Sequence, residues 1–439
     1  MKKILYFDKI NFDYPDLIFG YKYDGVSYEM SLPFGHIDKE IFDKFDSEFL
    51  DYLFFHIGMS LAVHFFNLDD FDEITCPYAL DDYAKNFFSN YLQKGLGEFR
   101  YTNNLDLQKK IKISSSENAR KYQPDINRKM QERILLMCGG GKDSAVAGRL
   151  MDSLVVDFSW LIVNPNRHRL ELAKKINDNI IMSGKLGFES KINLNRKFRG
   201  HKPLSAYLAF IGVLFAYLFD YKYICVGNEQ SSNSGNVTVD GFEVNHQYSK
   251  SYEFEKNFFD YVRQKMSKDI YYFSPLRPVY DLQLGKIFSH YKDLFNVIIS
   301  CNDNQKHSSW CAKCAKCAFT FLIMYPFMPD QEVERMFGAN LFESKIIRDW
   351  IRDMCVGDVR PFECIGTKDE CRFALYLCLI KEEGVLENKD YYEELNSYVG
   401  ELDLISAENK YLKNFENENN IPTSMKKDIF AFFSHHLEK

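Results

Sequence analysis

The sequence lacks several features that would place it in common classes of protein. With 55 basic and 62 acidic residues its net charge is -7 at pH 7, so it lacks the basic excess of a general nucleic-acid binder and we expect no nucleic-acid partner. No apolar stretch is long and clean enough to span a bilayer, because Leu204 to Phe219 is too short and predicts a buried helix. The first residues lack the apolar region and small-residue cleavage site of a signal peptide. We therefore expect a cytoplasmic protein with no membrane contact.

The composition instead indicates a large globular protein. Its 439 residues suggest two or three domains, and hydrophobic residues make up 46% of the chain, which is enough for a sizeable core. We find no internal repeat and no low-complexity tract. The eleven cysteines of a cytoplasmic chain indicate thiols and metal ligands rather than disulfides. Seven are scattered and expected to be small buried side chains: Cys76, Cys138, Cys225, Cys355, Cys364, Cys371 and Cys378.

A glycine-rich loop is the most informative motif. The apolar run from Arg133 to Cys138 predicts a buried strand, and Ala145 to Leu154 has the composition of a helix. Between them stand three glycines, a lysine, an aspartate and a serine: Gly139, Gly140, Gly141, Lys142, Asp143 and Ser144. A strand, a glycine turn and a helix bring backbone amides close to a phosphate, while lysine and serine donate hydrogen bonds and aspartate holds Mg²⁺ through its waters. The spacing differs from that of a Walker A loop.

The region from 131 to about 300 alternates strands and helices, which predicts a parallel sheet with helices on its faces. After the first strand and helix we expect strands at 155–163, 190–194 and 223–226, and helices at 169–180 and 204–219. Ligands of such sheets bind beyond the carboxyl ends of the strands. The glycine loop, Asn164 and the segment after Val226 all fall there, so we expect Asn164 to join the phosphate site.

The regions on either side have other patterns. Segments 18–23 and 26–32 alternate as a small antiparallel sheet, 41–66 has a helical period, and the polar stretch 104–130 predicts a linker. The last 110 residues are charged and helical in pattern. We predict four units: an N-terminal α+β domain at 1–125, an ATP-binding domain at 126–300, a zinc-binding segment at 301–329 and a helical domain at 330–439.

Four clustered cysteines predict a metal site. They follow the pattern C-x9-C-x2-C-x2-C, in which the C-x-x-C steps bring three thiolates to one ion and the first cysteine completes a tetrahedron: Cys301, Cys311, Cys314 and Cys317. Four sulfur ligands leave no open position, so we expect a structural Zn²⁺, with an iron–sulfur cluster as the alternative. Lys313 and Lys316 would offset the charge of the site.

Several polar side chains are candidates for catalysis or substrate binding. Glu229, just after a predicted strand, could bind Mg²⁺ or act as a base, and its neighbours could bind substrate oxygens: Asn228, Ser231 and Asn236. His246, Tyr248 and Lys250 gather before a helical run. The His246 and Lys250 side chains would share a face if that helix included them.

Two further candidates stand among residues with unusual surroundings. Arg277 lies between two prolines, which suits a fixed contact to phosphate or a salt bridge. Cys364 lies in a segment with an arginine, a carboxylate and a glycine turn, and is a candidate acid–base thiol.

Taken together, these segments resemble known enzymes. The glycine hexad is similar to the S-G-G-x-D-S loop of the PP-loop ATP pyrophosphatases, with Gly139 where that superfamily usually has serine. Most of the chain resembles one branch of it, the UDP-N-acetyl-α-D-muramoyl-L-alanyl-L-glutamate epimerases. The resemblance is carried by the hexad and by 95–103, 228–236, 244–255, 274–278, 300–301, 310–319 and 360–367.

The resemblance implies a PP-loop, HUP-like α/β fold and an ATP- and Mg²⁺-dependent isomerase. Such an enzyme adenylates the terminal L-glutamate of a UDP-linked muramoyl dipeptide, a peptidoglycan precursor, and inverts it to D-glutamate with release of AMP and pyrophosphate. Adenylation neutralises the carboxylate, so that an α-carbanion can form between a base and an acid. Asp143 then handles metal, and the proton carriers are to be found among His246, Lys250, Glu229 and Cys364.

Other functions stay open at this point. The four-cysteine arrangement after a Ser-Cys dipeptide also resembles 7-cyano-7-deazaguanine synthases, which adenylate a carboxylate and add ammonia but are much shorter than this chain. A tRNA-thiolating PP-loop enzyme is a further alternative that the acidic balance disfavours. A non-enzymatic reading is a zinc-stabilised, nucleotide-binding regulator. The exact acceptor and the oligomeric state do not follow from the sequence.

Overall fold

A computed structural model describes residues 2–188, 190–304, 307–381 and 390–438. Its centre is a five-stranded parallel sheet with the order β13-β10-β6-β7-β8. In that order the strands are Tyr271–Phe273, Tyr223–Cys225, Ile134–Met137, Phe158–Val163 and Ile180–Ser183. The expected parallel α/β sheet is therefore confirmed.

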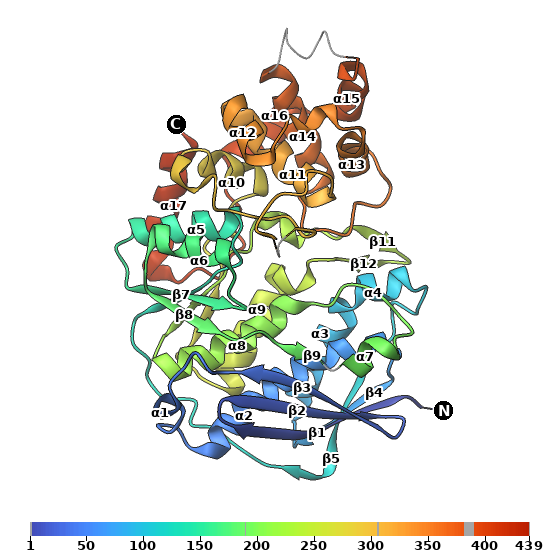
Figure 1. Ribbon diagram of the computed structural model, residues 1–439, viewed down its shortest axis with the longest axis vertical. Helices are drawn as coiled ribbons and strands as arrows, with labels where there is room; N and C mark the ends of the chain where they lie inside the picture. Colours follow the sequence, from blue (N-terminus) through green and yellow to red (C-terminus); the bar gives the residue numbers. More distant parts are fainter. Residues whose placement is uncertain (1, 189, 305–306, 382–389, 439) are drawn as a thin grey trace.

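Helices cover both faces of this sheet. Because side chains alternate along a strand, Ile134 and Leu136 of β6 pack into one core with α5 and α6, whereas Leu135 packs into the other with α8. One layer consists of α5 (Lys142–Ser153) and α6 (Arg167–Ile176). The other consists of α8 (Leu204–Phe219) and α9 (Tyr252–Lys265). The predicted strand–loop–helix unit is thus β6 followed by α5 (Figure 1), and most residues of both elements are buried.

The N-terminal part forms a second sheet, with the order β5-β4-β1-β2-β3-β9. The expected antiparallel pair is β2 and β3, while β4 and β5 run parallel to β1. In chain order the strands are Ile4–Asp13, Asp16–Tyr23, Val26–Pro33, Glu73–Tyr78, Lys112–Arg120 and Gly187–Phe188. Its helices are α1 (Lys39–Phe42), α2 (Ser47–Leu61), α3 (Asp82–Gly95) and α4 (Gly97–Thr102), and α2 packs against α8.

The C-terminal part is helical, as expected, and stands above the central sheet in Figure 1. Its helices share one continuous core with α5 and β6, so the region is packed onto the sheet rather than tethered to it. The helices are α10 (Asp281–Phe288), α11 (Ala315–Met324), α12 (Asp330–Phe337), α13 (Lys345–Cys355), α14 (Lys368–Lys381), α15 (Tyr392–Val399), α16 (Leu404–Glu408) and α17 (Thr423–Leu437).

Three local predictions are wrong. The segment 190–194 is the short helix α7 rather than a strand, and β8 at Ile180–Ser183 supplies that strand of the sheet instead. The helix expected to reach Ile180 ends at Ile176, because Asn177 turns out of helical geometry. The polar stretch 104–130 contains β5, whose Ile113 is buried and whose backbone pairs with β4. Pairing with a neighbouring strand overrides a polar composition that by itself favours a loop.

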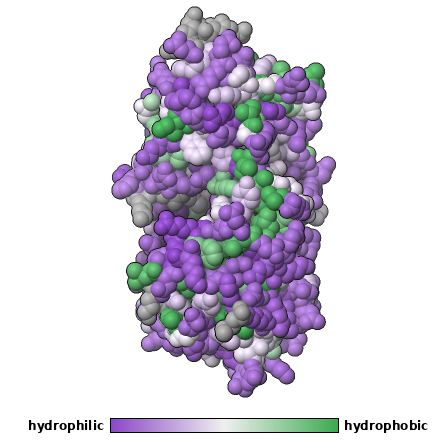
Figure 2. Space-filling view, turned by 90° about the vertical axis from the view of Figure 1, so that its right-hand side faces the viewer, coloured by the Kyte–Doolittle hydropathy of each residue, from purple (hydrophilic) through white to green (hydrophobic). Residues whose placement is uncertain are grey.

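One helical stretch meets the length and composition of a membrane span, contrary to our expectation. It runs through α2 and the following turn, Ser47–Asn67, and 83% of its apolar window is buried inside the molecule. This burial is that of a core helix between the two sheets. Figure 2 shows that the face turned toward the viewer is mainly hydrophilic, with hydrophobic residues gathered at mid-height.

Candidate active site

Side chains from other parts of the chain pack closely against the glycine loop. Gly140 has a φ of +85°, and a Cβ there would lie 2.7 Å from the ring of His168. A Cβ on Gly141 would lie 2.5 Å from the Ser300 hydroxyl. Glycine at these two positions is therefore required by backbone conformation and by space. The loop ends at Gly141, the N-cap of α5, so the positive end of that helix points toward the loop.

The polar residues of the hexad divide into two groups. The Ser144 hydroxyl accepts a hydrogen bond from the Gly139 amide at 2.8 Å. Lys142 instead is buried, and its ammonium contacts the carboxylates of Asp143 and Asp281. Burial raises the pKa of Asp143, but the charges of Lys142, Lys316 and Lys250 and the hydrogen bond from Lys142 together outweigh it, so the pKa is lowered overall and Asp143 stays ionised. The lysine thus holds the aspartate in place.

The loop forms one wall of a cavity of about 230 Å³. Three residues after β10, Val226 to Asn228, line it, together with Ile299, Ser300, Asn302 and side chains from the C-terminal part. The polar and glycine residues of the lining are Gly139, Gly141, Asp143, Ser144, Ser205, Gly227, Asn228, Lys250, Tyr272, Ser300, Asn302, Lys316 and Cys364. Residues far apart in the sequence therefore meet at the carboxyl ends of β6 and β10, as predicted.

A thiol faces this cavity among positive charges. The Lys250 ammonium lies 3.2 Å from the Cys364 sulfur, and the Lys316 ammonium donates to the Cys364 carbonyl. Burial by itself would raise the pKa of Cys364, but Lys250, His246 and Lys316 outweigh it and lower that pKa to about 5. Cys364 is therefore a thiolate at neutral pH, which suits a base or a nucleophile.

His246 carries a second positive charge that stabilises this thiolate, in addition to that of Lys250. Its Nδ1 is hydrogen-bonded to the Glu98 carboxylate, and its ring lies 4.0 Å from that of His201 between centroids. Burial lowers the pKa of His246, but hydrogen bonds to Cys364 and Glu98 raise it to about 9 overall. His246 and Lys250 precede α9, which begins after the Ser251 N-cap, so they meet at the thiol without sharing a helical face.

Glu229 lies in a separate acidic group. Burial, followed by the negative charges of Asp281 and Asp143, raises the pKa of Glu229 to about 8. This carboxyl group is buried and keeps its proton at neutral pH. Lys250, which feels the charges of both Cys364 and Glu229, connects the two groups.

Four other predicted polar residues serve mainly to hold segments together. Asn228 lines the cavity, and its backbone N–H donates a hydrogen bond to the Ser274 hydroxyl at 3.0 Å. Ser231 donates to Glu370 at 2.7 Å, Asn236 donates to a carbonyl of the 360–367 segment, and the Tyr248 hydroxyl lies 3.3 Å from a Glu253 oxygen.

Arg277 and Asn164 do not line the described cavity. The Arg277 side chain is completely buried, with one donor 2.7 Å from Glu255 and others on the carbonyls of Glu229 and Lys250. Asn164 is exposed and has a φ of +56°. A phosphate contact of either residue stays a prediction, whereas the observed role of Arg277 is to tie together the backbones of Glu229 and Lys250.

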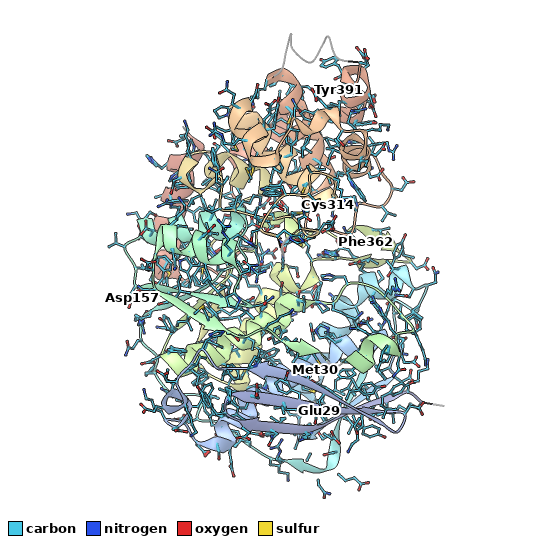
Figure 3. All side chains as sticks on the ribbon, viewed as in Figure 1. Glu29, Met30, Asp157, Cys314, Phe362 and Tyr391 are labelled. Carbon is cyan, nitrogen blue, oxygen red and sulfur yellow. The ribbon has the colours of Figure 1, made fainter. Side chains whose placement is uncertain are left out.

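The four clustered cysteines form a compact group. All four sulfur atoms lie within 4.8 Å of one another, and the measured Sγ–Sγ separations are 3.5, 3.7 and 4.0 Å. A tetrahedral ion with bonds of about 2.3 Å would place them about 3.8 Å apart. The cluster could therefore hold one metal ion. Figure 3 shows Cys314 of this cluster and Phe362, two residues before Cys364, between the central sheet and the C-terminal helices.

Sequence reasoning missed four residues of this site. Ser300 and Asn302 flank a predicted metal ligand, and Lys316 was assigned only to the charge of that site, yet all three line the cavity. Glu98 lies within a segment that carried the family resemblance, but no pattern linked it to His246.

Comparison with known proteins identifies the family. A model described as the MurL N-terminal domain matches residues 2–275, and one described as the MurL C-terminal domain matches 297–399. The chain therefore belongs to the MurL family, whose relatives are named UDP-N-acetyl-α-D-muramoyl-L-alanyl-L-glutamate epimerase.

Relatives from several bacteria match across most of their length. The epimerase of Xanthomonas oryzae pv. oryzae is 29% identical over 370 residues, covering 81% of this chain and 80% of its own. That of a Micromonospora species is 30% identical and covers 69% of each chain. That of Salinispora tropica is 30% identical, covering 69% of this chain and 68% of its own.

Proposed function

We propose that the chain is an ATP- and Mg²⁺-dependent epimerase acting on UDP-N-acetylmuramoyl-L-alanyl-L-glutamate, whose terminal L-glutamate it converts to D-glutamate. One observation carries this proposal: the glycine loop and the Cys364 thiolate line the same cavity. A phosphate-binding loop alone would fit any PP-loop enzyme. A thiolate held by Lys250 and His246 beside that loop adds the proton chemistry that an epimerase requires.

The ATP phosphates would lie on the loop amides and the N-terminus of α5. The Ser144 hydroxyl and Asn228 would donate to oxygens, and Asp143 faces the cavity as the residue that would hold Mg²⁺. When bound, Mg²⁺ neutralises phosphate charge and so favours departure of pyrophosphate. The glutamate carboxylate would then attack the α-phosphorus, which forms the acyl adenylate and releases pyrophosphate.

Two side chains with displaced pKa values, Cys364 and Glu229, are the groups that we assign to proton transfer at the α-carbon. In the acyl adenylate the carboxyl group is uncharged, so the carbanion left by proton removal can delocalise into its carbonyl. Cys364 and Lys250 are only 3.2 Å apart, so both approach the substrate from one side. We assign Cys364 as the base that removes the proton. Glu229, whose pKa is raised to about 8, keeps its proton, follows the lining residue Asn228 in the chain and is the acid that we assign to return a proton. Water then releases AMP.

The cysteine cluster would hold a structural Zn²⁺. Four sulfur ligands complete its coordination, and a single ion fits sulfur atoms that lie within 4.8 Å of one another. Because Ser300 and Asn302 flank Cys301, and Lys316 lies between Cys314 and Cys317, the ion would fix three cavity residues. The Zn²⁺ would therefore contribute by holding the cavity in its shape.

The test is incubation of the full-length protein with ATP, Mg²⁺ and the L-glutamate substrate, followed by chiral analysis of glutamate and chromatography of nucleotides. We expect D-glutamate together with AMP and pyrophosphate, and a loss of at least 100-fold in Cys364→Ser. Cys76→Ser is the matched control, because its hydroxyl can still donate to the Tyr78 carbonyl. AMP without inversion would contradict epimerisation and favour ammonia or sulfur transfer. Absence of any nucleotide product would contradict adenylation.

A further inference from the structure

Glu98 extends the thiolate cluster into the N-terminal part of the chain. It belongs to α4, and its carboxylate is hydrogen-bonded to His246, from which it is separated by 148 residues. Both side chains are nearly buried, with 11% of the Glu98 and 9% of the His246 side chain exposed. His246 and Cys364 act on each other electrostatically, since His246 lowers the pKa of the thiol and the thiol raises the pKa of His246. Three distant segments therefore meet in the order carboxylate, imidazole, thiol.

The order of these groups has a chemical consequence. An imidazole buried at this depth would be neutral without a counter-charge, and a neutral ring gives little support to a thiolate. The Glu98 carboxylate supplies the counter-charge and is hydrogen-bonded to Nδ1, so Nε2 is the ring nitrogen that this hydrogen bond does not use. A carboxylate that orients a histidine in this way also fixes which nitrogen carries the proton toward the reacting group.

We propose that Glu98 is a positioning residue that keeps His246 protonated and directed at the Cys364 sulfur, so that the three residues act as one relay. This inference deepens the proposed function, on which its kinetic part rests. Glu98 is not among the residues that line the described 230 Å³ cavity. Its effect passes through His246.

A metal ion shared by Glu98, His201 and His246 is the alternative use of this cluster, since one ligand atom from each lies within 4.8 Å of the others. The direct hydrogen bond between Glu98 and His246 occupies two of those atoms, which favours the relay. The other titratable groups that face Cys364, His246 or Glu98 act on both alternatives alike: His201, Lys202, Lys250, Lys316 and Glu363.

The experiment compares Glu98→Gln with the wild-type protein by the pH dependence of iodoacetamide labelling at Cys364, read by peptide mass spectrometry. Loss of the carboxylate should raise the labelling midpoint by about one pH unit, because His246 loses its charge at lower pH. His246→Gln should give a similar shift, and the double variant should add little to it. Glu98→Asp should recover part of the shift. Glu253→Gln, which removes an exposed ion pair with Lys94, is the control.

In the epimerase assay, Glu98→Gln should lower kcat about tenfold at pH 7 with KM within twofold. An unchanged labelling midpoint in both Glu98→Gln and His246→Gln would overturn the relay, even if activity fell. Two metal ions per chain, with one lost in Glu98→Gln, would also overturn it. Labelling requires no turnover, so a shifted midpoint in a protein without epimerase activity would support the relay and contradict only the proposed function.

Discussion

Replacement of Lys250 by methionine tests what keeps Cys364 ionised. The ammonium lies 3.2 Å from the sulfur. At an effective dielectric constant of 20, two unit charges at that distance interact by about 5 kcal/mol, equivalent to about four pKa units. His246 and Lys316 still stabilise the thiolate in the variant, and water that enters where the ammonium stood offsets about half of the loss. We therefore expect the pKa of Cys364 to rise by about two units, from about 5 to about 7.

The change in the thiolate fraction of Cys364 is largest at pH values between these two pKa values. At pH 6 the thiolate fraction should fall from about 90% to about 10%, so iodoacetamide labelling of Cys364 should slow about tenfold. The sign follows from the lowered pKa: the ionised form is present above the folded-state pKa and is lost as pH falls through it. Lys256→Met, which removes an exposed lysine paired with Asp260, should leave the profile unchanged. An unchanged midpoint in Lys250→Met would refute the electrostatic argument.

Three further perturbations separate stability from chemistry. Arg277→Met should lower the free energy of unfolding by about 3–5 kcal/mol in urea titration, because it leaves Glu255 buried and unpaired; a loss below 1 kcal/mol would contradict this. Gly140→Ala should abolish AMP formation, since its Cβ would meet His168, whereas Gly241→Ala shares a positive φ in open space and should keep it; equal activities would contradict the steric argument. Cys314→Ser should lower both the metal content measured by mass spectrometry and the Tm, and full retention of metal would exclude that residue as a ligand.

The central unit of the fold could be predicted because its signals are local. The segment 133–154 contains an apolar run, three glycines and a helical pattern, which predict a strand, a turn and a helix. The structure confirms the strand as β6 and the helix as α5. The same holds for the helical C-terminal part and for α8, whose composition leaves no polar face. Cysteine spacing likewise identified a cluster that could hold a metal ion.

The remaining features depend on tertiary contacts that no local pattern carries. The serine-rich β5 is a strand because β4 lies beside it, and the short helix at 190–194 replaces a strand already supplied by β8. The approach of Glu98 to His246 spans 148 residues and has no periodicity to reveal it. The flanking prolines of Arg277 fitted a phosphate contact or a salt bridge alike, and only the structure shows the salt bridge to Glu255 and the bonds to backbone carbonyls.

The central claim is that one cavity both activates the glutamate and exchanges its α-proton. The most direct measurement is the reaction with ATP, Mg²⁺ and the L-glutamate substrate in deuterated water, with mass and chiral analysis of the product. The account predicts D-glutamate that carries one α-deuterium and forms together with AMP, and no exchange when ATP is omitted. D-glutamate that keeps its original hydrogen, or exchange that proceeds without ATP, would contradict it.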